Sequence, residues 1–148
     1  MATGMQVDVV APDGMVWQGE AVSVIVRTTE GDIGILTDHE PVMAAMVPCA
    51  AEVVTEDGRR EIIAVGGGFI SVYHNRVALL SDSATLASEV SLTSAQQALA
   101  AMQPKVDSGD MKDQDWVLHH LLEAQVKAGE RYNQLHGQDV MAGGERRD

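Results

Sequence analysis

The first 88 residues contain short apolar stretches that alternate with polar positions and are separated by turn residues. Val7 and Val9 share one face of a stretch whose other face is polar, which is typical of a half-buried strand. Asp57-Gly58 is a strong hairpin signal, and His74-Asn75 joins a second pair of apolar stretches. Turn signals recur roughly every 8–12 residues, so the pattern predicts roughly seven to ten short strands in a β-sandwich or a flattened barrel.

After Ser88 the apolar spacing changes to that of helices. A stripe with i, i+3, i+4, i+7 spacing predicts a first helix and consists of Ala95, Ala98, Leu99 and Met102. Thr93 and Gln96 fit a capping box at its start, and Pro104 is expected to end it. A second helix is predicted from about Asp113 to Leu135.

These changes in pattern predict a mainly β sandwich, with about ten strands, followed by a C-terminal α-helical hairpin. The predicted division is a sandwich at residues 4–88, a two-helix domain at 89–136 and a flexible tail at 137–148. The tail is predicted from Gly137 and from a further pair of glycines near the end of the sequence.

The most distinctive stretch lies between residues 28 and 42. Gly31 and Gly34 bracket a short apolar segment, and an Asp-His-Glu turn precedes Pro41. A residue before proline favours an extended conformation, so the stretch predicts strand, tight turn, strand and then a polar loop facing solvent. His39 in this loop is interpreted either as a residue that stabilises the turn or as a contact for a partner.

Composition excludes several classes of function. The net charge of -12 disfavours nucleic acids and anionic membrane surfaces as partners, because both are bound through Lys and Arg. Cys49 is the only cysteine, so a disulfide within the chain and a cysteine-based metal cluster are excluded. The first residues do not resemble a signal peptide, and no apolar run is long enough to predict a membrane span.

No motif in the sequence predicts an active site, a cofactor or a metal centre. Gly66-Gly67-Gly68 leads into a predicted strand rather than a helix and lacks the Lys of a phosphate-binding loop, so we interpret it as a tight bend. His119 and His120 are adjacent and therefore diverge on a helix, unlike the i, i+4 pair of a helical zinc site. Cys49 has no base near it in sequence and is expected in the core.

Three segments resemble the epsilon subunit of rotary F-type ATP synthases. The first is Val16-Trp17-Gln18-Gly19, similar to the opening hairpin of that family. The second runs from Glu30-Gly31-Asp32-Ile33-Gly34-Ile35 to His39-Glu40-Pro41-Val42. The third is the Gly-Gly-Phe hairpin that begins at Val65-Gly66-Gly67-Gly68-Phe69 and continues through Asn75-Arg76-Val77 to Ala84. Together they span most of residues 5–88 in the order of the family.

The resemblance implies a non-catalytic rotor subunit of a proton-translocating complex, seated in the central stalk of a bacterial F1Fo ATP synthase. Its partners would be the gamma subunit, the c-ring and the beta subunit, and it would lie at the cytoplasmic face of the cell membrane, associated only through the complex. By the same resemblance Glu30, Gly31 and Asp32 face the c-ring and gamma, and His39 lies near the same rotor surface.

The resemblance is weaker in the helical part. In the family, two C-terminal helices can extend along gamma and inhibit ATP hydrolysis through basic residues that face an acidic loop of beta. Here residues 107–115 contain four aspartates and one lysine, which leaves Lys127 and Arg131 as the candidate contacts to beta. The family's ATP-binding motif needs an Asp and an Arg, and the aligned residues 90–98 contain neither, so little or no ATP binding is expected.

One competing hypothesis belongs to a different class. A free-standing β-sandwich binding module, with a helical tail that dimerises, would show the same periodicities. Co-purification with the large ATPase subunits would favour the rotor interpretation, and self-association of the isolated chain would favour the module.

Overall fold

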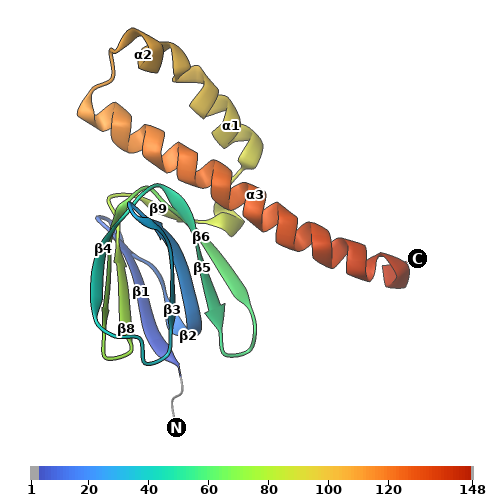
Figure 1. Ribbon diagram of the computed structural model, residues 1–148. Helices are drawn as coiled ribbons and strands as arrows, with labels where there is room; N and C mark the ends of the chain where they lie inside the picture. Colours follow the sequence, from blue (N-terminus) through green and yellow to red (C-terminus); the bar gives the residue numbers. More distant parts are fainter. Residues whose placement is uncertain (1–3, 148) are drawn as a thin grey trace.

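The computed structural model describes residues 4–147, with side chains described through residue 137. A β-sandwich forms its first part, and a helical hairpin lies across one end of the sandwich (Figure 1). The strands are β1 (Met5–Ala11), β2 (Gly14–Thr28), β3 (Gly31–Leu36), β4 (Val42–Met46), β5 (Cys49–Thr55), β6 (Arg60–Val65), β7 (Gly68–Tyr73), β8 (Arg76–Leu80) and β9 (Ala84–Leu86). The predicted fold class is confirmed.

The described residues contain nine strands, where the sequence predicted about ten. The longest of them is β2, a single strand of 15 residues. Its first half pairs with β1, and its second half pairs with β3 and β5, with a shift in register between Ala21 and Ser23. Thr28 at its end also pairs with Met46 of β4.

The core of the sandwich is formed by the inward faces of these strands. In β1 the buried and half-buried positions alternate, as the sequence predicted. The fully buried side chains are almost all aliphatic, because the chain has few aromatic residues to fill the space. The largest of them are Met5, Ile35, Ile63, Ile70 and Leu79.

The helical part contains η1 (Ala87–Glu89), α1 (Leu92–Ala101), α2 (Gln103–Ser108) and α3 (Asp113–Arg147). α3 packs on β5 and β6, and α1 packs on α3 (Figure 1). Ala124 and Ala128 of α3 are fully buried against Ile62 and Ala64 of β6. Small residues at this contact let the helix approach the sheet closely, and Gly66 lies directly beneath Leu121.

One prediction about the first helix was wrong. The N-cap is Ser91, whose side chain accepts a hydrogen bond from the Ser94 amide, so Thr93 lies inside the helix. The first helix ends at Ala101, just before Pro104, as expected, and Pro104 itself stands in the first turn of a further short helix, α2, where its missing N–H costs nothing. Gly109 ends α2 in the left-handed conformation with φ 75°.

α3 begins at Asp113 as predicted, but it continues past the predicted end near Leu135. A glycine ends a helix when its backbone turns left-handed, and Gly137 shows no such φ. Inside a helix a glycine costs only about 1 kcal/mol relative to alanine, so the helix passes through it. The domain limits and the flexibility predicted for residues 137–148 stay predictions, and residue 148 lies outside the described residues.

The Asp115 side chain stabilises the start of α3 through two contacts, and we expect both contacts to be lost in acid. Its carboxylate accepts a hydrogen bond from the Lys112 amide at 3.0 Å and pairs with Lys105 of α2 at 3.2 Å. The hydrogen bond from the Lys112 amide, followed by the Lys105 pair, lowers the pKa of Asp115 below its usual value. A lowered pKa in the folded state means that the contribution to stability is complete above the unfolded value, about 3.9, and is lost as the pH falls through the folded value.

The protection of the amides of residues 113–116 against hydrogen exchange, relative to the intrinsic exchange rate at each pH, should therefore fall below about pH 4 in the native protein. The Asp115→Asn variant keeps a hydrogen-bond acceptor but has no charge to lose, so its protection should not show this acid-dependent fall. Equal pH profiles for the two proteins would contradict the assignment.

Candidate interaction surfaces

The β2–β3 turn presents the first group of predicted site residues. The Thr28 hydroxyl donates to the Gly31 carbonyl at 2.7 Å and accepts from the Glu30 amide at 3.1 Å, which fixes the turn. Gly31 has φ 113°, a value that favours glycine. The Glu30 side chain is exposed and is therefore free to meet a partner.

Asp32 lies at the start of β3, on the outer face of the sheet. Its carboxylate forms an ion pair with Arg27 of β2, with 2.9 Å between Nε and Oδ1. The two side chains are 61% and 58% exposed, so water screens the pair and it adds little to stability. The pair therefore presents an accessible carboxylate that a partner can bind.

His39 belongs to the loop between β3 and β4. Asp38 before it has φ 68°, and this conformation is held by Asn75 at the β7–β8 turn. The Asp38 amide donates to Asn75 Oδ1 at 2.6 Å, and Asn75 Nδ2 donates to Asp38 Oδ1 at 2.9 Å. The half-buried His39 ring has Nδ1 at 2.7 Å from the carbonyl oxygen of Glu40.

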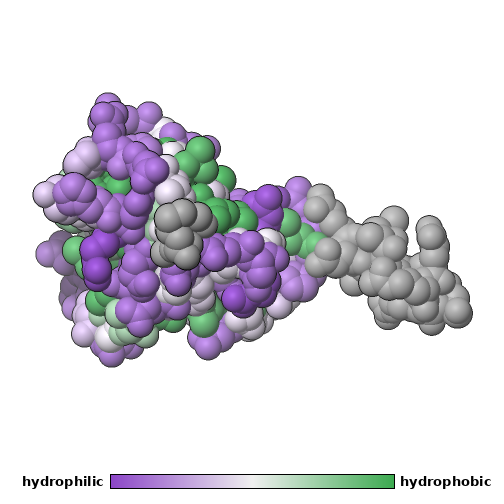
Figure 2. Space-filling view, turned by 90° about the horizontal axis from the view of Figure 1, so that it is seen from below, coloured by the Kyte–Doolittle hydropathy of each residue, from purple (hydrophilic) through white to green (hydrophobic). Residues whose placement is uncertain are grey.

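The structure does not bring these predicted residues together. The β2–β3 turn lies at the end of the sandwich that carries the helices, whereas the loop after β3 lies at the other end, near the N-terminus (Figure 1). Glu30 and Asp32 belong to or adjoin that turn, and His39 belongs to the loop. Six residues of strand span about 20 Å, so the expected common surface for His39 and Asp32 would have to extend over that length. Seen from below, the end opposite the helices is mainly hydrophilic, with apolar residues in separate patches (Figure 2).

Lys127 and Arg131, the predicted contacts to another subunit, bind the chain's own sandwich. Lys127 Nζ donates to the Pro48 carbonyl at 3.1 Å. Arg131 binds Glu52 of β5 with two hydrogen bonds, 3.0 Å from Nε and 3.1 Å from Nη2. Arg60 also reaches Glu52, at 3.4 Å, so one half-buried carboxylate holds two guanidinium groups. In this arrangement the side chains of Lys127 and Arg131 are both occupied.

One shallow hollow joins the two groups of predicted residues. It has a volume of about 390 Å³ and lies on the outer face of β2 and β5, beside α3. Arg27, Asp32 and Lys127 are among its lining residues. The docked helix therefore places a lysine near the carboxylate of the β2–β3 turn.

An exposed apolar surface on β4, β7 and β8 was not predicted from the sequence. Met43 lies opposite Ser71, and Phe69 lies opposite Leu80, which places all of them on the outer face of one sheet. Met43 is 71% exposed and Phe69 is 54% exposed. The signal was present in the sequence, because a strand with apolar residues at both alternating sets of positions has an apolar outer face as well as a buried one. We call the set Met43, Phe69, Tyr73 and Leu80 the apolar sheet face.

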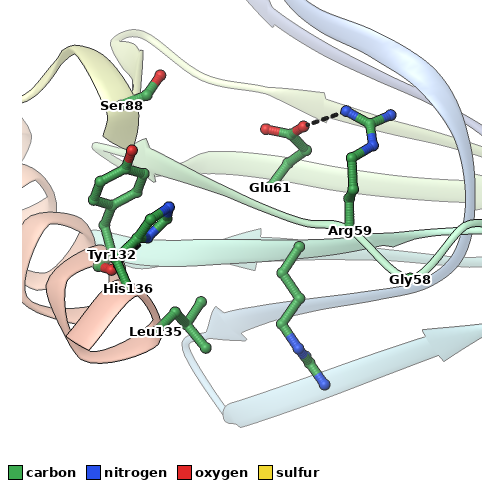
Figure 3. A pocket seen from close by; sticks show the side chains of 8 residues that line it. Gly58, Arg59, Glu61, Ser88, Tyr132, Leu135 and His136 are labelled. Atoms are coloured by element: carbon green, nitrogen blue, oxygen red, sulfur yellow. Dashed lines mark hydrogen bonds and ion pairs between the residues drawn. The ribbon is translucent and has the colours of Figure 1, made fainter. Parts of the chain in front are cut away.

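A cavity of about 590 Å³ lies where the β5–β6 hairpin, η1 and α3 meet. Figure 3 shows the Arg59–Glu61 ion pair on one side of it and the Tyr132 and His136 rings on the other. The two rings are stacked with 4.0 Å between centroids, and Arg59 also pairs with Asp57. The Arg59 and Glu61 side chains are thus engaged in ion pairs, and the two rings stack on each other. The cavity lies at the junction between the sandwich and α3.

The bend predicted at Gly66-Gly67-Gly68 and the core position predicted for Cys49 are confirmed. Gly66-Gly67-Gly68 forms the bend into β7, with φ above 110° at Gly67 and Gly68. Cys49 is buried, and burial raises the pKa of its thiol.

Among the described residues no group of three or more His, Cys, Asp or Glu side chains is arranged to hold a metal ion. In the same part of the chain, no helix has both the length and the apolar character needed to cross a membrane.

Known proteins resemble the chain over most of its length. The family described as "ATP synthase, Delta/Epsilon chain, beta-sandwich domain" matches residues 4–87. The ATP synthase epsilon chain of Cutibacterium acnes is 41% identical over 132 residues, which cover 84% of this chain and 90% of that protein. The ATP synthase epsilon chain of Streptomyces avermitilis is 38% identical over 108 residues, covering 73% of this chain and 87% of that protein.

A solved structure shares the fold. A chain in the structure of the Euglena gracilis mitochondrial ATP synthase (OSCP/F1/c-ring) has a TM-score of 0.67, with 19% identity, and covers 90% of this chain and 83% of that chain. At this level of identity the likeness is one of fold.

Proposed function

The chain belongs to the ATP synthase delta/epsilon family, and from this premise we propose that it is the epsilon subunit of the central stalk in an F1Fo ATP synthase. Its role is to couple proton-driven rotation of the c-ring to gamma and so to ATP synthesis. The observation that carries the proposal is the 41% identity to an ATP synthase epsilon chain over 90% of that protein's length. In this role the chain is a non-catalytic subunit, held at the cytoplasmic face of the membrane through its partners.

Two parts of the sandwich support the proposed rotor contacts. The apolar sheet face is the surface that we assign to gamma, because a contiguous exposed apolar area on a soluble domain is typical of a protein interface. Glu30, Gly31 and Asp32 form the proposed contact to the polar loops of the c-ring. His39 then makes a separate contact with the rotor, since it lies at the other end of β3.

Regulation by the helices depends on the same basic side chains that dock them. Lys127 and Arg131 are engaged with Pro48 and Glu52. A contact between these residues and an acidic loop of beta therefore requires α3 to leave the sandwich. The docked arrangement is accordingly the state that does not inhibit hydrolysis.

The test uses the catalytic subcomplex of alpha, beta and gamma from the same organism, with the full chain added. The chain should co-elute with the subcomplex at one copy per gamma. Met43→Asp should weaken binding by about tenfold or more, because it places a charge in the apolar sheet face. Leu118→Asp is the matched control: Leu118 is 48% exposed but lies on α3, off the sandwich.

Failure of the native chain to bind would contradict the rotor proposal. Self-association of the isolated chain without binding would instead favour the free-standing module. Equal loss of binding in the Met43 and Leu118 variants would leave the subunit role intact but overturn the assignment of the apolar sheet face to gamma.

A further inference from the structure

β3 is an edge strand with one free side. It pairs with β2 along its whole length and, among the described strands, with no other. The alternate backbone amides and carbonyls that point away from β2 therefore have no strand to bind. A free edge of this kind can accept a further strand from another chain.

This edge lacks two of the features that most often keep edge strands from pairing. Gly31–Leu36 contains no lysine and no proline, the residues that most often protect an edge. Its charged residue, Asp32, is paired across the sheet with Arg27. The space beside Gly34 is open, since a Cβ built there meets no atom within 4 Å.

The outer face beside the edge is apolar at Ile25 and Leu36, whereas the Arg27–Asp32 ion pair occupies its end at the β2–β3 turn. Leu36 is 63% exposed, and Ile25 of β2, opposite Gly34, is 39% exposed. These side chains offer contacts to alternate residues of an added strand, and such contacts give strand addition its specificity. A strand bound here would gain both backbone hydrogen bonds and apolar contacts.

The charges around the edge select the kind of partner. Glu30 and Asp32 lie at one end of β3, where Arg27 pairs with Asp32, and Asp38 and Glu40 follow its other end, so acidic side chains outnumber basic ones around the strand. A second copy of this chain, paired antiparallel, would bring Glu30 of one β3 toward Asp38 and Glu40 of the other. Like charges placed together oppose such a dimer, so the edge fits a partner with basic residues near the ends of its strand.

We propose that β3 binds an extended segment of another subunit, apolar at alternate positions and basic at its ends, which continues the sheet beyond β3. The inference rests on the proposed function in one respect, because the partner is placed within the ATP synthase. It differs from the rotor contacts above, which use side chains of the turn and of the apolar sheet face. Strand addition uses the backbone of β3.

The test compares backbone hydrogen exchange in the isolated chain and in the whole ATP synthase, purified through a tag on this chain. In the isolated chain the β3 amides that face away from β2 should exchange rapidly. In the complex these amides should exchange at least about tenfold more slowly. A partner that touched only the Thr29-Glu30 turn would leave exchange within β3 unchanged, and that result would overturn the inference while the proposed function stood.

Two other outcomes are also decisive. Protection of β3 that grows with the concentration of the isolated chain would identify a second copy as the occupant, which overturns the assignment of a basic partner. If the tag recovers no other ATP synthase subunit, the proposed function fails and the inference fails with it.

A pair of variants adds a second measurement. Gly34→Lys places a positive charge beside the edge, where a basic partner would be repelled, and its incorporation into the complex should fall at least about tenfold relative to the native chain in competition. Gly137→Lys is the control, because its Cβ position is equally open but lies on α3. The melting temperatures of the isolated variants report whether each is folded, and equal incorporation of the two folded variants would overturn the inference.

Discussion

A Gly68→Ala variant is expected to lose about 3 kcal/mol or more of its free energy of unfolding, a large share of the 5–15 kcal/mol that small domains possess. Gly68 has φ 118°, which a side chain strains. A Cβ there would also overlap the Leu80 carbonyl oxygen and lie 2.9 Å from Ser81 Cα. Because both of these atoms belong to the backbone, β7 and β8 must move apart to make room. Urea denaturation followed by circular dichroism measures the loss.

A Gly58→Ala variant measures the cost of backbone strain without a steric overlap of the added Cβ. Gly58 also has a positive φ, 88°, but a Cβ built there meets nothing within 4 Å. Its cost should be limited to the strain of the backbone, about 1 kcal/mol. If the two variants lost the same stability, the close approach of Leu80 to Gly68 would not be what requires glycine at that position.

An Ala128→Glu variant is expected to release the helical hairpin while the sandwich stays folded. Ala128 is fully buried between α3 and the sheet. A carboxylate cannot remain there unpaired, because burying a charge without a partner costs several kcal/mol. The docking of a small hairpin is worth only a few kcal/mol, so the helix should leave the sheet. Ala98→Glu on the exposed face of α1 is the control.

A thiol cross-link across the docked interface reports the release. Gln125 Nε2 lies 3.2 Å from Thr85 Oγ1, so a short bifunctional maleimide should join cysteines at these two positions rapidly when α3 is docked. Cys49 is buried and should not interfere. Ala128→Glu should slow this cross-link at least about tenfold, and Ala98→Glu should not. Rapid cross-linking in Ala128→Glu would show that the interface tolerates the charge.

Released α3 has a consequence for the proposed regulation. Lys127 and Arg131 would become available to beta, so hydrolysis by the catalytic subcomplex should be slower with Ala128→Glu than with the native chain. The same rate with both chains would indicate that these two residues do not act on beta.

The local structure could be predicted from the sequence because it depends on neighbours in the chain. The turn at His74-Asn75 is an example: both residues have positive φ, 48° and 61°, and Asn tolerates that region. The start of α3 at Asp113 was also predictable from its spacing. The N-cap at Ser91 could not be predicted, because Ser91, Thr93 and Ser94 lie close together and each of them can serve as an N-cap.

The location of the candidate residues could not be predicted in the same way. Periodicity assigns a residue to a face but does not say which strand lies beside it. The contact of Lys127 with Pro48 joins residues 79 positions apart, and the parallel pairing of β1 with β8 joins the two ends of the sandwich domain. His39 and Asp32 are far apart because the strand β3 runs between them. The spacing of residues in a motif does not give the length or the direction of a strand.

The length of β2 has a mechanical consequence for a subunit that transmits rotation. β2 is hydrogen-bonded to β1, β3, β4 and β5, and the β2–β3 turn stands at its end. A force applied to that turn along the strand acts on many backbone hydrogen bonds in shear at once, whereas a short hairpin at a sheet edge could be peeled away one bond at a time. A load on Asp32 is therefore shared by both halves of the sandwich, and the tightly packed core gives little under it. The turn should move with the body of the domain as one stiff unit.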